Sequence, residues 1–167
     1  MTISMYQASV PVLAHGLNNL VAIIDKAAAH CAAKKIDPSV LINFRLTPDM
    51  LPFKAQIYIL TDGAKGCAAR LAGAEVPSYA DTEATFEDLK ARLLKTAQFV
   101  QTFTAAQIDG SEEKDIVLKF GPNEFKFKGQ GYLTNFVLPN FYFHSTVAYS
   151  ILRHCGVELG KRDFLGG

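Results

Sequence analysis

The strongest constraint on the fold of this chain is a run of apolar residues that recur every three or four positions, found in four separate segments. This spacing places the apolar side chains on one face of an α-helix, which must be buried against other structure. We therefore expect an all-α domain built around a four-helix bundle. The first helix is predicted from about Ser4 to Ala33, with its stripe formed by Tyr6, Val10, Leu13, Leu17, Leu20, Ile24, Ala27 and Cys31.

The other three helices are predicted in the same way. Pro52 fits the first turn of the second helix and Gly73 closes it, whereas Asp81 or Thr82 is the expected N-cap of the third. Pro139 must either begin the fourth helix or kink it. The three stripes are Phe53, Ile57, Leu60, Ala64, Cys67 and Leu71; Phe86, Leu89, Leu93, Val100 and Phe103; and Leu133, Val137, Asn140, His144, Val147 and Ile151.

Between the third and fourth helices, from Asp115 to Gly129, the apolar period changes to two. Ile116, Leu118 and Phe120 occupy alternate positions before a Gly-Pro-Asn turn, and lysines alternate with phenylalanines after it. This pattern predicts a small β-hairpin before the last helix, with its lysines on the solvent side.

Length and charge restrict the classes of function. A chain of 167 residues with no linker or repeat fits one domain, residues 1–167, and a net charge of +1 provides no field to attract nucleic acid. The uncharged stretch between Lys128 and Arg153 contains too many polar residues for a membrane span. Three cysteines without a CxxC pair and an N-terminus unlike a signal peptide predict a cytoplasmic protein with reduced thiols.

Asn140 and His144 are polar residues on an otherwise apolar stripe, one turn apart on the same face. Because burying an imidazole and an amide without partners is costly, both need hydrogen bonds, and Gln56 beside the seam of the second helix could supply one. Three interpretations stay open. The cluster is a structural polar network, a pocket for a small molecule, or a metal site in which His144 is the only strong ligand.

Four segments carry a family resemblance, and together they extend over essentially the whole chain. They are RLTPDM at 45–50 followed by Gln56, LPNFYFH at 138–144, AYSILRH at 148–154 and GKRDFLG at 160–166. These motifs resemble an uncharacterised bacterial family, catalogued as domain of unknown function nineteen ninety-three. That family is similar to the wider DinB-like superfamily of metalloenzymes.

The resemblance implies an up-down-down-up four-helix bundle, often dimeric, with a metal held by one histidine on the second helix and two on the last. By this resemblance, Asn140 and His144 fall on the two histidine positions of the last helix, and Gln56 lies near the histidine position of the second helix. We therefore expect a metal-free bundle in which Gln56, Asn140 and His144 line an interior polar pocket for a small ligand, or a structural or interaction role. The alternative is a DinB-like metal-dependent transferase or hydrolase, with a divalent metal at His144. A homodimer is the expected assembly, with neither nucleic acid nor membrane as a partner.

Overall fold

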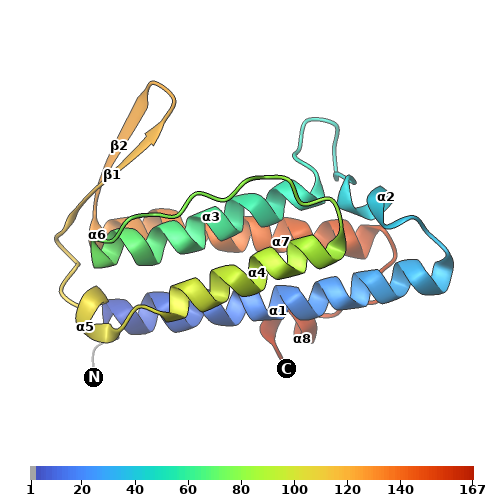
Figure 1. Cartoon of the computed structure of the whole chain (residues 1–167), viewed down its shortest axis with the longest axis horizontal. Coiled ribbons are helices and arrows are strands. Elements are labelled where there is room, and N and C mark those ends of the chain that lie inside the picture. Colours follow the sequence, from blue (N-terminus) through green and yellow to red (C-terminus); the bar gives the residue numbers. More distant parts are fainter. Residues whose placement is uncertain (1–2) are drawn as a thin grey trace.

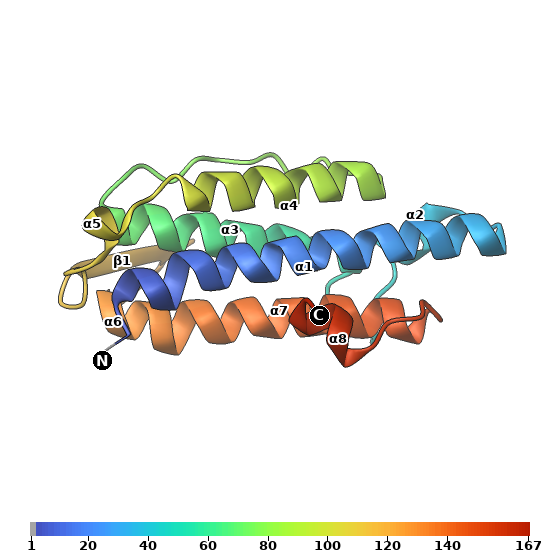
Figure 2. The same cartoon turned by 90° about the horizontal axis from the view of Figure 1, so that it is seen from below.

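The computed structural model describes residues 3–167 and is mostly helical, as predicted, with a small antiparallel sheet before the last long helix. Figure 1 shows the four long helices side by side, with α1 and α7 running in one direction and α3 and α4 in the other. Figure 2 shows the same helices from below, where α4 and α7 lie on opposite sides of α1 and α3. The long helices are α1 (Met5–Lys34), α3 (Phe53–Ala72), α4 (Phe86–Gln101) and α7 (Leu138–His154).

The ends of α1 and α3 follow from local chemistry. The Ser4 hydroxyl and the Gln7 side chain form a capping box at the start of α1. Pro52 precedes the first residue of α3, where its missing N–H costs no helical hydrogen bond. Gly73 ends α3 with a φ of 75°, a left-handed conformation that glycine adopts without strain.

The start of α4 differs from the prediction, because its N-cap is Thr85 and neither Asp81 nor Thr82. The Thr85 hydroxyl accepts a hydrogen bond from the Asp88 amide at 3.1 Å, and the Asp88 carboxylate accepts one from the Thr85 amide at 3.0 Å. This reciprocal pair fixes the helix start. Asp81 is instead engaged in an ion pair with Arg92.

Apart from the segment that leads into α7, three short helices in the described part of the chain were not predicted, because each is too short for a periodic stripe. They lie in the connections and at the C-terminal end of the chain. They are α2 (Pro38–Ile42), α5 (Ala105–Ile108) and α8 (Lys161–Leu165).

The hairpin forms where the alternation predicted it, from β1 (Asp115–Phe120) and β2 (Asn123–Lys128). Ile116 and Leu118 are buried, whereas Lys119 and Lys126 are exposed, as expected for a small sheet with one solvated side. Figure 1 shows the hairpin projecting from one end of the helices. Leu118 of β1 lies beside residues of α3 and of the start of α7.

Pro139 was expected either to begin the last long helix or to kink it, and the segment that leads into α7 shows features of both. The chain passes through α6 (Gly129–Gly131) and the π-helix η1 (Tyr132–Val137), and Pro139 then lies in the first turn of α7. Proline lacks an N–H and its ring crowds the carbonyl four residues earlier, so the regular α-helical ladder cannot pass through it. The wider π turn absorbs this interruption and keeps Tyr132 in the buried interior.

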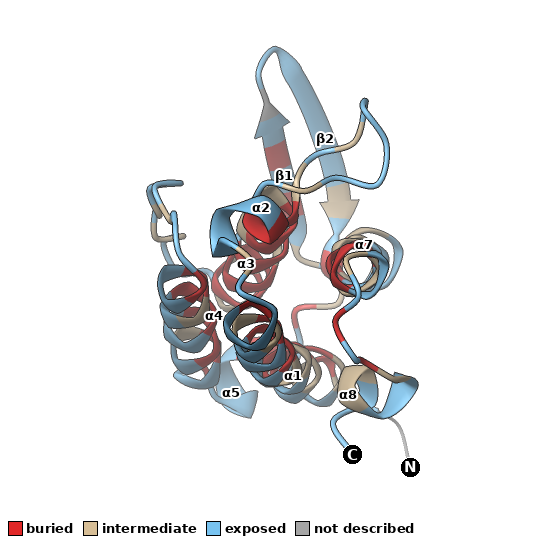
Figure 3. Ribbon diagram, turned by 90° about the vertical axis from the view of Figure 1, so that its right-hand side faces the viewer, coloured by how far each residue is buried: buried red, intermediate tan, exposed pale blue. Residues whose placement is uncertain are grey.

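The predicted stripes form the core. Figure 3 shows buried residues concentrated between α1, α3 and α4 and on the inner side of α7. α1 is long and apolar enough to cross a membrane, but half of its most apolar 18-residue stretch is buried against the rest of the chain. The largest fully buried side chains include Tyr132, Phe53 and Phe141.

Candidate ligand-binding site

Gln56 and His144 meet across the interface of α3 and α7. Gln56 is 2% exposed, and its amide N–H donates to the Leu51 carbonyl at 2.9 Å, which fixes the orientation of the amide. The Gln56 carbonyl oxygen therefore faces His144 and accepts a hydrogen bond from Nδ1 at 2.7 Å. Because an amide oxygen only accepts, Nδ1 of His144 carries the proton and Nε2 carries the lone pair.

Burial lowers the pKa of His144, so the neutral imidazole is favoured. The Gln56–His144 pair is thus a satisfied, uncharged contact that ties the first turn of α3 to the middle of α7. This contact matches the first of the three interpretations that the sequence left open, a structural polar network.

Asn140 lies apart from this pair. It is half-buried and faces the middle of α3, where a Cβ placed on Gly63 would be 3.8 Å from Nδ2 of Asn140. Within residues 3–167 no hydrogen bond connects Asn140 to Gln56 or His144. Figure 1 shows that α3 and α7 run antiparallel. This explains the separation, because His144 contacts Gln56 near the start of α3, whereas Asn140, one turn earlier on α7, lies near Gly63, further along α3.

Asn140 instead contributes to the wall of a cavity of about 560 Å³. The cavity is bounded by α3, by η1 and the start of α7, by the hairpin and by the segment 76–78 that follows α3. Its size lies in the range of small-molecule sites. The lining residues are Ile59, Asp62, Gly63, Lys65, Arg70, Val76, Pro77, Ser78, Leu118, Tyr132, Phe136 and Asn140.

The wall contains three charged side chains, Asp62, Lys65 and Arg70, which differ in their ion-pair partners. Lys65 is buried and paired with Asp62, which also accepts from Arg92 at 3.1 Å. Arg70 donates from Nη1 to the hydroxyl of Tyr132 at 3.1 Å, and no carboxylate among the described residues lies within ion-pair distance of its guanidinium. Two cations and one anion leave a charge of +1 in the wall, located on Arg70.

Tyr132 and Cys67 adjoin this arginine. Burial raises the pKa of the Tyr132 hydroxyl to about 12 and that of the Cys67 thiol to about 12. Both groups therefore stay protonated at neutral pH, and Cys67 is a core filler without thiolate character, as expected from its stripe position. Tyr132 is a neutral hydrogen-bonding partner that holds Arg70 in place.

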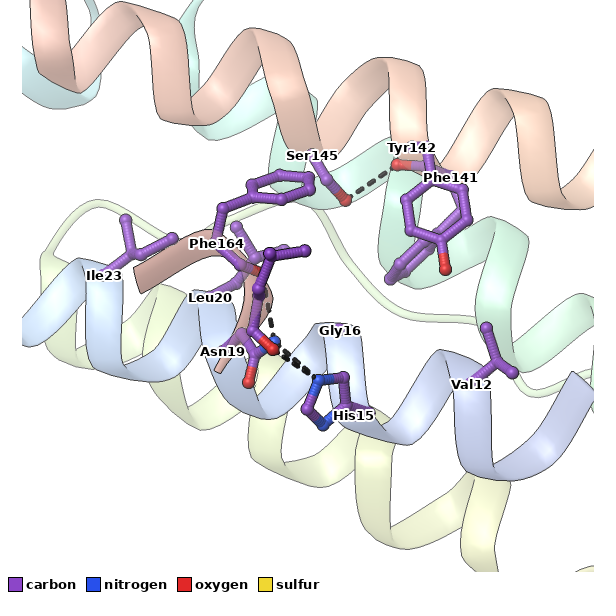
Figure 4. Close-up of a pocket in the computed structure, with 11 residues that line it drawn as sticks. Val12, His15, Gly16, Asn19, Leu20, Ile23, Phe141, Tyr142, Ser145 and Phe164 are labelled. Carbon is purple, nitrogen blue, oxygen red and sulfur yellow. Dashed lines mark hydrogen bonds between the residues drawn. The ribbon is translucent and has the colours of Figure 1, made fainter. Parts of the chain in front are cut away.

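A much smaller pocket of about 80 Å³ lies between α1, α7 and the C-terminal segment. Figure 4 shows His15 and Asn19 of α1 turned toward that segment, whereas the Phe164 ring lies on the α7 side, near Ser145. The His15 ring nitrogen Nε2 lies 2.9 Å from the Leu165 carbonyl, and the Asn19 amide donates to the Phe164 carbonyl at 3.1 Å. The chain itself satisfies these groups, so the larger cavity is the stronger candidate.

Sequence reasoning missed a buried arginine next to the cavity. Arg92 of α4 is 3% exposed and fastens the segment 80–83 to α3 and α4, beside residues 76–78 that cover the cavity. Its position three residues after Leu89 places it on the buried face of α4, which was the available signal. Its partners are the Thr61 hydroxyl at 2.8 Å, the Ala80 carbonyl at 3.1 Å, Glu83 at 3.1 Å, Asp81 at 3.0 Å and Asp62 at 3.1 Å.

Gln56, Asn140 and His144 do not form a suitable set of metal ligands. These are the positions at which the superfamily resemblance implies a metal. The carbonyl oxygen of Gln56 is engaged by His144, and Asn140 lies one turn away in the cavity wall. One imidazole nitrogen remains, and neutral amides hold zinc or nickel weakly. Within residues 3–167, no group of three or more His, Cys, Asp or Glu side chains is placed to hold a metal ion.

Comparison with known proteins places the chain in a family and finds similar solved structures. The model of the family described as "Domain of unknown function (DUF1993)" matches residues 5–165. A crystal structure of a DinB family member protein from Shewanella denitrificans is similar over 97% of this chain and 92% of that one, with 35% sequence identity and a TM-score of 0.88. No curated protein matches the chain.

Proposed function

The chain belongs to the DUF1993 family, and we propose that it binds a small organic molecule in the cavity between α3 and α7, without a tightly held metal ion. The single observation that carries this proposal is the cavity itself, which combines the Asn140 amide and the Arg70 guanidinium with several apolar side chains. Such a mixture of apolar surface and a few polar groups is typical of sites for small molecules.

Within this proposal, Asn140 contacts the ligand directly, because its amide can both donate and accept hydrogen bonds. Gln56 and His144 have a different task. Their hydrogen bond of 2.7 Å holds α3 and α7 at a fixed spacing, so that the cavity one turn further along keeps its shape. The directions of the long helices support an up-down-down-up four-helix bundle as the topology.

A metal-dependent transferase or hydrolase is the second candidate, favoured by the lone pair on Nε2 of His144 and by the likeness to a DinB family member. The two candidates differ in metal content. We expect elemental analysis of the untagged protein to find no stoichiometric zinc or nickel. A near-stoichiometric metal that His144→Ala removes would favour the metalloenzyme.

The proposal treats residues 1–167 as one domain. A homodimer and a cytoplasmic location stay predictions, and neither is required for the cavity to bind a ligand. The Tyr142 and Phe143 side chains on α7 are 43% and 57% exposed, which supports self-association through this helix.

Gly63 provides a sharp test, because its position in the cavity wall leaves room for a side chain. A ligand that binds only the folded chain raises the midpoint of thermal unfolding. We expect fragment-sized organic molecules to do so for the native protein. Gly63→Leu, whose side chain would occupy the cavity, should abolish that rise.

Gly63→Ala is the matched control. It adds one methyl group at ordinary contact distance from Asn140, so the cavity stays open. Its higher helix propensity should also stabilise the protein by about 0.5–1 kcal/mol. Fragments that stabilise Gly63→Leu as strongly as the native protein would place their binding outside the cavity and contradict the proposal.

A further inference from the structure

We infer that the ligand of the α3–α7 cavity is an organic carboxylate with an apolar body, whose carboxylate is bound by the guanidinium of Arg70. This inference rests on the proposed function, because it names the chemical class of the molecule that the cavity takes. Three features of the described residues support it: the lack of a carboxylate partner for Arg70, the glycine against its guanidinium, and the apolar side chains in the same wall.

None of the carboxylates in the described part of the chain forms an ion pair with Arg70. Arginine stays protonated at all ordinary pH values, and a partly buried charge is costly unless it is paired. Lys65 and Arg92 share Asp62, and Arg92 has Asp81 and Glu83 as well. Arg70 is the one cation in the cavity wall for which the described residues supply a hydroxyl and no carboxylate.

The sequence makes room for this guanidinium. A Cβ on Gly66 would overlap Nη1 of Arg70, so the glycine allows the guanidinium to lie along α3. Glycine inside a helix costs about 1 kcal/mol relative to alanine. Nη1 donates to the Tyr132 hydroxyl at 3.1 Å. The other N–H groups of the planar fork have no acceptor among the described residues and are available to an anion.

The same features favour a carboxylate over a phosphate. Arg70 supplies one uncompensated positive charge, whereas a phosphate group carries close to two negative charges and would need a second free cation. A carboxylate matches both the single charge and the flat, two-pronged geometry of guanidinium. Asp62, the one carboxylate in the wall, is already paired with Lys65 and Arg92. The apolar part of the wall suits a hydrocarbon or aromatic body, and it is formed by Ile59, Val76, Pro77, Leu118 and Phe136.

Benzoate and benzamide form a matched pair of probes, because they share size and shape but differ in charge. Isothermal titration calorimetry should give the native protein an affinity for benzoate about tenfold or more above that for benzamide. Arg70→Gln should lower the benzoate affinity by about tenfold or more and leave the benzamide affinity unchanged.

A second variant displaces the charge without deleting it. Gly66→Ala should push the guanidinium away from its position against α3, and we expect the same selective loss of benzoate affinity. Lys90→Gln on α4 is the control for net charge and should bind both probes like the native protein. Circular dichroism verifies that each variant is folded, and Gly66→Ala serves as the test if Arg70→Gln does not fold.

Each outcome bears on the inference. Equal affinities of the native protein for the two probes, unchanged benzoate affinity in Arg70→Gln, or no benzoate binding up to its solubility limit would overturn it. Equal affinities that Gly63→Leu abolishes would overturn the carboxylate while the proposed function stands. Binding of both probes that persists in Gly63→Leu would overturn the proposed function as well.

Discussion

Replacing Arg92 with methionine should lower the free energy of unfolding by about 3–5 kcal/mol. Methionine keeps much of the aliphatic volume but removes all of the donors. Water can reach Asp62 and Asp81, whose side chains are about half exposed, at 49% and 55%. Glu83 is only 15% exposed, so it would be left without its partner in a poorly solvated position. Urea denaturation of the native protein and of Arg92→Met measures the difference.

Lys90→Met is the matched control for this loss. Lys90 also lies on α4 and also pairs with a carboxylate, Asp25 at 2.7 Å, but this pair is on the surface. Such pairs contribute about 0–1 kcal/mol. A loss below about 1 kcal/mol for Arg92→Met would contradict the view that Arg92 fastens the segment 80–83 to the helices.

Gly129→Ala should lower the free energy of unfolding by about 2–3 kcal/mol. Gly129 joins the hairpin to α6 and is buried. A Cβ at this position would overlap the carbonyl oxygen of Ser111, which is backbone and accepts a hydrogen bond from the Lys114 amide at 3.1 Å. Either the base of the hairpin or α6 must move to make room, and urea denaturation measures the cost.

Gly131→Ala, two residues further along, is the control for this effect. It lies in the same short helix, and its Cβ would meet only the Asn135 side chain at 3.9 Å. The free energy of unfolding of Gly131→Ala should be unchanged or higher by up to about 1 kcal/mol. Equal effects of the two substitutions would show that helix propensity, and not the contact with Ser111, governs this joint.

The four long helices and the hairpin could be predicted because their signals are local. Apolar spacing of three and four defined α1 and α3 to within a residue at most ends, and the change to a period of two defined β1 and β2. The start of α4 could not be predicted, because Asp81, Thr82 and Thr85 are all good caps. The choice depends on the ion pair of Asp81 with Arg92, which joins residues from different parts of the fold.

The candidate site could be predicted only in part. The stripe position of His144 and the position of Gln56 beside the seam of the second helix indicated that these two side chains meet. The position of Asn140 depends on how far α7 is shifted along α3, which the sequence does not show. Arg70 looks like an ordinary surface residue in the sequence, because arginine is usually exposed. The readable signal was the pair of glycines at 63 and 66 in the middle of α3, where glycine is unfavourable unless space is needed.

Mapping of amide chemical shifts in ¹⁵N-labelled native protein during a benzoate titration tests most directly whether the α3–α7 cavity is the ligand site. We expect the largest shifts at Gly63, Ser78, Tyr132 and Asn140, which surround the cavity, and small shifts at His15 and Asn19 in the pocket beside α8. Shifts confined to the small pocket between α1, α7 and the C-terminal segment, or spread over the exposed lysines without saturation, would contradict this account.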